Sequence, residues 1–385
     1  MFPEQFQYQN YTIEVHDSLL SESLRNEWDF FTGERSNLHS RWLQIIENAT
    51  PQDLKFRYFL IRTDSEKGAV AGVIYFQLLS FSQRNFKFKK FNPFYSAISL
   101  LVKLRNFKVL LAGNLFSVDF SPLKYDSQKL SQHELLNIVD SWVIKQKHDI
   151  FVMKDLNNEF TPALMIQREF DFFDSDLTMQ MDILPIWKEF RDYEKSLKHK
   201  YSQRARKIRR AGEVLARKKI SPEDFKANSE EFIRLFMNVA EHQVVRMGIV
   251  GKEYYHEIFD KLGDAFEMIA YYYQNKLIAF ASYITYEKKL EVHYIGMDYQ
   301  FNKEYYLYFN ILFDSIEKAI SAGKKHLELG RTAREAKAVI GCKAIYFNDY
   351  IRVNNKLSKF ILKLLKKYFN KDAGSDWRNR HPYKS

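Results

Sequence analysis

The sequence predicts an α/β fold made of two domains, each a mixed sheet of the α+β kind flanked by helices. Its 385 residues are too many for one small domain and suit two of ordinary size. Hydrophobic residues make up 46% and charged residues 28%, a balance typical of globular proteins. Both halves also show the same order of expected elements: helix, hairpin, strand, helix, strand, short helix and strand. This repetition indicates a tandem duplication, with a chance match between two common arrangements as the alternative.

The second half shows the clearer pattern. Ser221 and Pro222 suit the N-cap and the first position of a helix. The polar residues 274–276 separate two apolar, aromatic runs, which predicts a β-hairpin. Strands are expected over 290–297 and 326–330, with a helix between them. Such a strand–helix–strand segment predicts a pair of parallel strands.

The first half repeats this order. A hairpin is expected around residues 64–68, and a strand over 107–120. Ser131 and Glu134 form a capping-box pattern at the start of the next helix, which leads to a strand over 149–154. The predicted divisions are an N-terminal domain (1–185), a basic helical connector (186–220), and a C-terminal domain (221–385) that ends in a basic amphipathic helix.

Composition excludes several classes of protein. Cys342 is the single cysteine, so an intrachain disulfide and a multi-cysteine metal site are excluded, and we expect no metal. The N-terminus lacks a basic region followed by an apolar run, which argues against a signal peptide. The most apolar stretch is broken by Lys103, Arg105 and Lys108, so no transmembrane helix is predicted. A cytoplasmic protein is therefore expected.

The formal net charge of +11 indicates an anionic partner, unless the chain is simply basic. Seven Lys or Arg residues lie within 198–210, a candidate contact for tRNA phosphates. The alternative is a solvated basic helix that packs on the second domain. The run 355–369 predicts a basic amphipathic helix, a candidate peripheral contact with the inner face of a membrane. The alternative is a terminal helix docked on the core.

One stretch of the second half resembles a known family. It combines YIGMD at a strand end, an aromatic helix, AG before the next strand, and GR…K…G after it. These features resemble the GNAT superfamily, and a tandem pair with a basic helix resembles its Fem-type branch and peptidoglycan-related N-acyltransferase-like proteins. The resemblance covers most of 190–355 directly, and 1–185 through the internal repeat. It implies two tandem GNAT-like domains.

The resemblance implies transfer of an acyl or aminoacyl group to an amine of a small or cell-wall-type substrate. The implied donors are an acyl-CoA, an acyl carrier or an aminoacyl-tRNA. Acetyl-CoA-binding members have a glycine-containing basic loop before the long helix, which cradles the pyrophosphate. Here that loop, 298–306, has no glycine and only one basic residue, Lys303. We therefore do not expect ordinary acetyl-CoA binding. The rival reading is a non-catalytic GNAT-fold module that binds an anionic metabolite, a cell-wall precursor or RNA.

GNAT-like sites open between the strand before the long helix and the strand after it, here 290–297 and 326–330. His293 is a candidate general base because its unperturbed pKa lies near neutrality; the alternative is a buried structural histidine. Period-two alternation places His293 and Tyr294 on opposite faces of their strand. Asp298 is a candidate base or amine anchor, or else a turn residue. His293, Tyr294 and Asp298 form the candidate catalytic set.

The candidate substrate-binding residues are Arg331, Lys337, Glu328 and Arg246. Arg331 suits bidentate binding of a carboxylate or phosphate, and Lys337, six residues later, is expected to line the same anion-binding cleft. The alternative is a structural ion pair between Arg331 and Glu328. In the first half, residues 113–114 are Gly-Asn, where acid–base groups would be needed. The N-terminal domain is therefore expected to be a non-catalytic copy.

Overall fold

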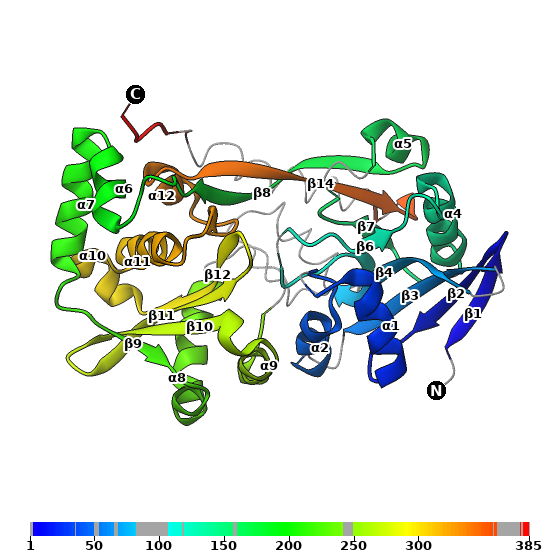
Figure 1. Cartoon of the computed structure of the whole chain (residues 1–385), viewed down its shortest axis with the longest axis horizontal. Coiled ribbons are helices and arrows are strands. Elements are labelled where there is room, and N and C mark those ends of the chain that lie inside the picture. Colours follow the sequence, from blue (N-terminus) through cyan, green and yellow to red (C-terminus); the bar gives the residue numbers. More distant parts are fainter. Residues whose placement is uncertain are drawn as a thin grey trace. The chain divides into compact units, whose positions relative to one another are not determined.

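The computed structural model describes residues 3–34, 36–49, 54–64, 68–81, 107–117, 119–156, 160–241, 249–356, 358–359, 378 and 380–384. The chain forms two compact units, whose elements are labelled in Figure 1. The first unit comprises Met1–Asp176, Val245–Val250 and Phe347–Phe369. The second comprises Leu177–Val244, Gly251–Tyr346 and Asn370–Ser385.

The first unit is a mixed sheet with helices. Its elements are β1 (Glu4–Tyr8), β2 (Tyr11–His16), α1 (Glu22–Thr32), α2 (Ser40–Ala49), β3 (Lys55–Thr63), β4 (Val70–Phe81), β5 (Phe107–Ala112), β6 (Leu123–Tyr125), α4 (Gln132–Val143), β7 (Ile150–Met153), α5 (Pro162–Gln167) and the start of β8 (Asp171–Asp182). The strands run in the order β1-β2-β3-β4-β5-β7, and the end of β14 (Lys343–Val353) pairs with β7. All neighbours are antiparallel except β5 and β7, which are parallel.

The second unit has a similar order of elements, preceded by two further helices. They are α6 (Phe190–Ser196), α7 (His199–Ala211), β9 (Ala216–Ile220), α8 (Pro222–Ala240), α9 (Lys252–Leu262), β10 (Phe266–Tyr273), β11 (Lys276–Thr285), β12 (Lys289–Met297), α10 (Asn302–Tyr305), α11 (Leu307–Ser321), β13 (His326–Glu328), α12 (Arg334–Val339) and the start of β14. The end of β8 pairs with β13, and the order continues β13-β12-β11-β10-β9. Only β12 and β13 are parallel.

Both units therefore contain a hairpin followed by a parallel strand–helix–strand segment, and the expected mixed sheets flanked by helices are confirmed. The expected connector, 186–220, folds as α6, α7 and β9 and belongs to the second unit. The strand expected over 107–120 was too long, since β5 ends at Ala112. There the side chain of Asn114 accepts a hydrogen bond from the Phe116 amide (2.9 Å), a local turn that competes with the strand.

Helices cover both faces of the second unit's sheet. Helices α8 and α9 pack on one face, and α6, α7 and α11 gather on the other (Figure 1). Gly296 on β12 lets α8 come close, because a Cβ there would lie 2.7 Å from the backbone nitrogen of Phe236. No helix in the described part of the chain is long and apolar enough to cross a membrane. Most of the predicted amphipathic helix, 355–369, lies outside the described residues.

Candidate active site

The two parallel strands of the second unit separate after a short stretch of pairing. Strand β12 pairs with β13 only at Lys289–His326, Leu290–Leu327 and Glu291–Glu328. Strand β12 then continues to Met297. The chain after β13 instead bonds to β8, where the Leu329 amide donates to the Met179 carbonyl (2.9 Å). The two strands therefore separate beyond Glu291 and Glu328, and this divergence, called the opening below, lies where the site was expected from the sequence.

A β-bulge shapes the edge of this opening. Ala281 on β11 faces Ile295 and Tyr283 faces Val292, so Ser282 stands opposite both His293 and Tyr294. The Ser282 hydroxyl accepts from the Tyr294 amide (3.0 Å) and donates to the Tyr294 carbonyl (3.2 Å). The extra residue interrupts the alternation of side chains along β12.

The bulge corrects one expectation from the sequence. Strict alternation placed His293 and Tyr294 on opposite faces of the strand, and this is wrong. Their ring centroids lie 4.2 Å apart, and both rings contact Tyr254 of α9. Both side chains therefore lie on the face of the sheet that α8 and α9 cover.

His293 belongs to a buried chain of hydrogen bonds. Its Nδ1 lies 2.8 Å from Oε1 of Glu291, and its Nε2 lies 2.7 Å from the hydroxyl of Tyr254. The hydroxyl of Tyr286 donates to the other oxygen of Glu291 (3.1 Å). The His293 side chain is only 3% exposed. Both of its ring nitrogens are engaged, so any proton exchanged with a substrate passes through Tyr254 or requires the chain to open.

The electrostatics of this chain favour one protonation state. Burial acts to raise the pKa of the Glu291 carboxyl, but the hydrogen bond from His293 and the charges of His293 and Lys289 outweigh it and hold the pKa below its usual value. Burial raises the pKa of the Tyr254 hydroxyl well above its usual value. The lowered pKa keeps Glu291 ionised, so it accepts the Nδ1 proton of His293, and the raised pKa keeps the Tyr254 hydroxyl protonated beside Nε2.

Glu328 is a second buried carboxylate, paired in register with Glu291 at the base of the opening. It is 1% exposed and accepts from the Lys289 ammonium (2.6 Å) and the Thr178 hydroxyl (3.2 Å). A buried charge needs such partners, because removing one leaves an uncompensated ion. Glu328 thus helps to fix the strand end from which the Arg331 loop departs.

Arg331 follows β13 and lies within electrostatic reach of Tyr294. Burial raises the pKa of the Tyr294 hydroxyl, Glu291 adds to this, and the charge of Arg331 acts in the opposite direction.

Lys337 on α12 is 2% exposed, and its ammonium donates to the Gly330 carbonyl (3.2 Å). Burial lowers the Lys337 pKa to about 8. Lys337 therefore lies beneath the loop that carries Arg331, with its ammonium removed from solvent.

Asp298 has a local structural role. Its Oδ1 accepts from the Gln300 amide (3.1 Å), which caps a single 3₁₀ turn, and its Oδ2 lies 3.6 Å from the Lys276 ammonium. This matches the turn reading weighed in the sequence analysis. Arg246 lies outside the described residues.

One backbone amide at the start of α11 is already bonded to a side chain of the protein. Asn302 accepts from the Tyr308 amide (2.9 Å) in the first turn of α11. The Asn310 side chain donates to the Tyr305 carbonyl (2.8 Å) and to the Ile208 carbonyl of α7 (3.0 Å). These bonds lock the loop before α11, and one of the amides that a phosphate would need is already used.

Sequence reasoning missed three of these groups. Glu291 stands two residues before His293 on one strand, so its spacing was a usable signal. Tyr254 comes from α9, and Ser282 bonds to the Tyr294 backbone only because of the bulge. Neither arrangement can be recognised from the neighbouring residues in the sequence. Within the described ranges, no group of His, Cys, Asp and Glu side chains is arranged to hold a metal ion.

Comparisons with known proteins agree with this fold. Residues 195–338 match the family model described as an acetyltransferase (GNAT) domain. A solved structure of FemX is 12% identical and aligns over 88% of this chain and 98% of its own, with a TM-score of 0.51. A tandem GNAT protein from the clavulanic acid biosynthesis pathway, solved without acetyl-CoA, is 9% identical, with coverage of 89% and 98% and a TM-score of 0.50. No curated protein matches the chain.

At such low identities the two structures establish the fold alone. The matched domain confirms the resemblance to the GNAT superfamily over residues 195–338, and the two structures show that the fold is similar to those of FemX and a tandem GNAT protein.

Proposed function

We propose that this chain, which carries a GNAT-type domain, is an N-acyltransferase that moves an acyl or aminoacyl group onto an amine. The observation that carries the proposal is the opening between β12 and β13, with a buried carboxylate–imidazole–phenol chain at its edge. The family match over 195–338 supports the reaction class. The proposed acceptor is a small or cell-wall-type amine.

The proposed mechanism starts at the acceptor, since an ammonium must lose a proton before it attacks a carbonyl carbon. Tyr254 takes that proton while it passes its own to His293, and Glu291 stabilises the resulting imidazolium. Tyr294 packs against His293 and shapes the same edge of the opening. Arg331 binds an anionic group of a substrate bidentately, and Lys337 holds the Gly330 carbonyl so that this loop keeps its shape. Asp298 acts on the turn that leads to α11.

The first unit is proposed to be a non-catalytic copy. Where its parallel strands end, Asn114 bonds to the backbone, and Lys154 forms a buried ion pair with Asp155. A buried lysine–aspartate ion pair holds its two charges against each other, which suits a structural role.

The donor is proposed to be held away from the start of α11, because Asn302 occupies that turn. This argues against ordinary acetyl-CoA and for an acyl carrier or an aminoacyl-tRNA. The basic helix α7 is the candidate docking element for either donor. A peripheral membrane contact through 355–369 stays a prediction, since most of that segment lies outside the described residues.

A non-catalytic binding module is the second candidate. Two observations favour it: His293 is buried with both nitrogens engaged, and Asn302 already uses one amide at the start of α11. Such a module would use Arg331 to hold an anionic metabolite, a cell-wall precursor or RNA without transferring anything.

The test is an acyl-transfer assay in which the amide product is detected by mass spectrometry. The full-length protein is incubated with acylated carrier protein or aminoacyl-tRNA and a panel of amines that includes cell-wall precursors. We expect amide product with one donor, and its loss with Tyr254→Phe and His293→Gln. If no product forms with any pair while an anionic ligand binds in an Arg331-dependent way, the binding-module reading replaces the transferase.

A further inference from the structure

One short segment joins two parts of the second unit that lie far apart in the sequence. It consists of Arg378 and residues 380–384 (red in Figure 1) and is called the clamp segment below. Its first contact is with the first turn of α12. The Arg380 guanidinium pairs with the Glu335 carboxylate, with Nε 2.9 Å from Oε1, and the Arg378 amide donates to Oε2 (2.9 Å). Both oxygens of Glu335 are therefore held by the clamp segment.

The same segment is bonded to the turn between α6 and α7. The Lys198 amide donates to the Pro382 carbonyl (2.8 Å), and the Lys384 amide donates to the Ser196 carbonyl (2.8 Å). These bonds use backbone groups, so the segment stays anchored there when one of its side chains is replaced. The clamp segment thus ties α12 to a second, independent part of the unit.

Tyr383 of the clamp segment packs at the other end of α12. Its ring lies against those of Trp187 and Tyr193, with centroids 5.9 Å and 6.5 Å away. A Cβ at Gly341 would overlap the Tyr383 ring, so the close approach requires a glycine there. The clamp segment therefore holds α12 at both ends, through Arg380 at the first turn and through Tyr383 just after the last.

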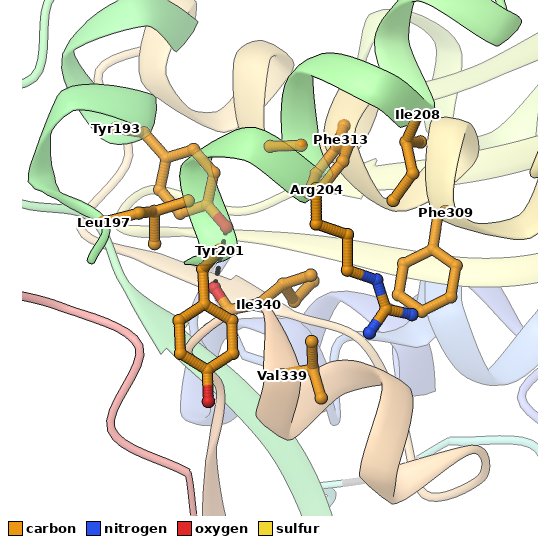
Figure 2. Close-up of a pocket in the computed structure, with 10 residues that line it drawn as sticks. Tyr193, Leu197, Tyr201, Arg204, Ile208, Phe309, Phe313, Val339 and Ile340 are labelled. Carbon is orange, nitrogen blue, oxygen red and sulfur yellow. Dashed lines mark hydrogen bonds between the residues drawn. The ribbon is translucent and has the colours of Figure 1, made fainter. Parts of the chain in front are cut away.

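Helix α12 needs such contacts because it is short. It has six residues, and no side chain in the described part of the chain caps its start. An isolated helix of this length is unstable in water, so its position depends on packing. Figure 2 shows a further contact, the bond from the Tyr193 hydroxyl to the Ile340 carbonyl (2.9 Å). Within the helix, Lys337 donates to the carbonyl of Gly330 (3.2 Å), which directly precedes Arg331.

We infer that the clamp segment holds the loop 329–333 in the position that the site requires, with Arg380 and Tyr383 as positioning residues. Their effect passes through α12 to the loop, and hence to Arg331. The inference rests on the proposed function for the role of Arg331, which is to bind an anionic group of a substrate. Strand β13 is bonded on both sides, to β12 and to β8. Release of the clamp should therefore move the loop and leave the strand in place.

Cys342 offers a direct measure of clamp release, because it is the single cysteine and directly follows Gly341. Its thiol is buried, and burial raises its pKa to about 12. The experiment measures how fast dithionitrobenzoate modifies the native full-length protein. Tyr383→Ala should raise this rate roughly tenfold or more, since a packed aromatic ring is lost. Arg380→Gln should raise it roughly threefold through movement of α12, since one ion pair at the surface is lost.

Hydrogen exchange followed by mass spectrometry locates the movement. In both clamp variants, amides of 329–342 should gain in exchange rate by a larger factor than those of β12 and β13. A general loss of stability would instead speed exchange in the strands by the same factor. The matched controls are Arg234→Gln, which removes an ion pair of similar exposure on α8, and Tyr272→Ala, which removes a partly buried ring on β10. Both should leave loop exchange and the Cys342 rate within about twofold of wild type.

The transfer assay adds a test at the site itself. Tyr383→Ala should raise the KM for the anionic substrate roughly tenfold and leave kcat within about twofold, because the loop binds substrate while the His293 chain is unchanged. Equal factors in loop and strands, clamp variants that match their controls, or an unchanged KM despite faster loop exchange would each overturn the inference. Absence of transfer by the wild type counts against the proposed function alone, because the thiol and exchange measurements need no substrate and still decide the inference.

Discussion

The Nδ1 atom of His293 lies 2.8 Å from Oε1 of Glu291, and the two residues stand two positions apart on β12. This pair fixes which imidazole nitrogen carries the proton. Because the Glu291 pKa is held below its usual value, the carboxylate stays an acceptor for Nδ1, and Nε2 lies 2.7 Å from the Tyr254 hydroxyl. The bulge at Ser282 then places Tyr294 beside the same imidazole.

Replacing Glu291 by Gln should reduce the free energy of unfolding by about 2 kcal/mol, since a buried charge-assisted hydrogen bond is lost. Transfer activity should fall with it, because the imidazole loses its orientation. Urea denaturation at neutral pH measures the first effect. Glu231→Gln is the control: its exposed pair with Arg234 should contribute less than about 1 kcal/mol.

The same variant has a predicted pH dependence. The folded-state pKa of Glu291 lies below its unfolded value, so its carboxylate stabilises the fold above the unfolded pKa. That contribution is lost as pH falls through the folded pKa. The stability difference between wild type and Glu291→Gln should therefore shrink in acid. A constant difference from neutral pH to the acid limit of folding would contradict the assignment.

Replacing Lys337 by Met should leave stability at neutral pH unchanged or raise it, because the native fold buries an ammonium whose pKa is lowered to about 8. The direction in which stability changes with pH follows from the numbers of protons bound by the folded and unfolded chains. Between that value and the usual lysine pKa, the unfolded chain binds more protons than the folded one, so wild-type stability rises with pH. The variant should lack this rise. Denaturation at neutral and alkaline pH tests it, and parallel curves for the two proteins would refute it.

Gly341→Ala should destabilise the second unit more than Gly323→Ala. Both glycines have positive φ, 104° and 61°, so alanine is strained at each by roughly 1–2 kcal/mol. Only at Gly341 would the new Cβ also overlap Tyr383, whereas Gly323 has open space. Thermal unfolding should show an additional loss of roughly 1–3 kcal/mol for Gly341→Ala. Similar losses for the two variants would mean that Tyr383 does not pack there in solution.

Asp314→Asn should loosen α7 and β9 from α11. The Asp314 carboxylate accepts from Arg209 and from Nε of Arg217 (2.7 Å), so one group joins three elements. We expect a loss of about 2 kcal/mol in unfolding free energy, larger than for an exposed pair. Hydrogen exchange should show that the variant speeds the opening of α7 more than it speeds the opening of α8. An unchanged α7 would show that its apolar side, with Ala205 and Ile208, is sufficient to hold it.

The sequence by itself determined the features that depend on neighbouring residues. The predicted capping box at Ser131 and the predicted N-cap at Ser221 are confirmed, because a cap is formed within three residues. The turn at Gln274 and Asn275 is confirmed, and both residues adopt positive φ. The repeated order of elements followed from such local signals, and with it the two-unit mixed α/β fold.

Only the tertiary structure decided the chemistry of the site. The bulge depends on the register between β11 and β12, which alternation within one strand does not reveal. Tyr254 reaches His293 from a helix that lies 39 residues away in the chain. Lysine side chains are usually exposed, yet the fold buries Lys337 beneath Gly330 and lowers its pKa. These outcomes depend on long-range packing, which sets the burial and partners of each charged group, whereas the local sequence sets only its position along an element.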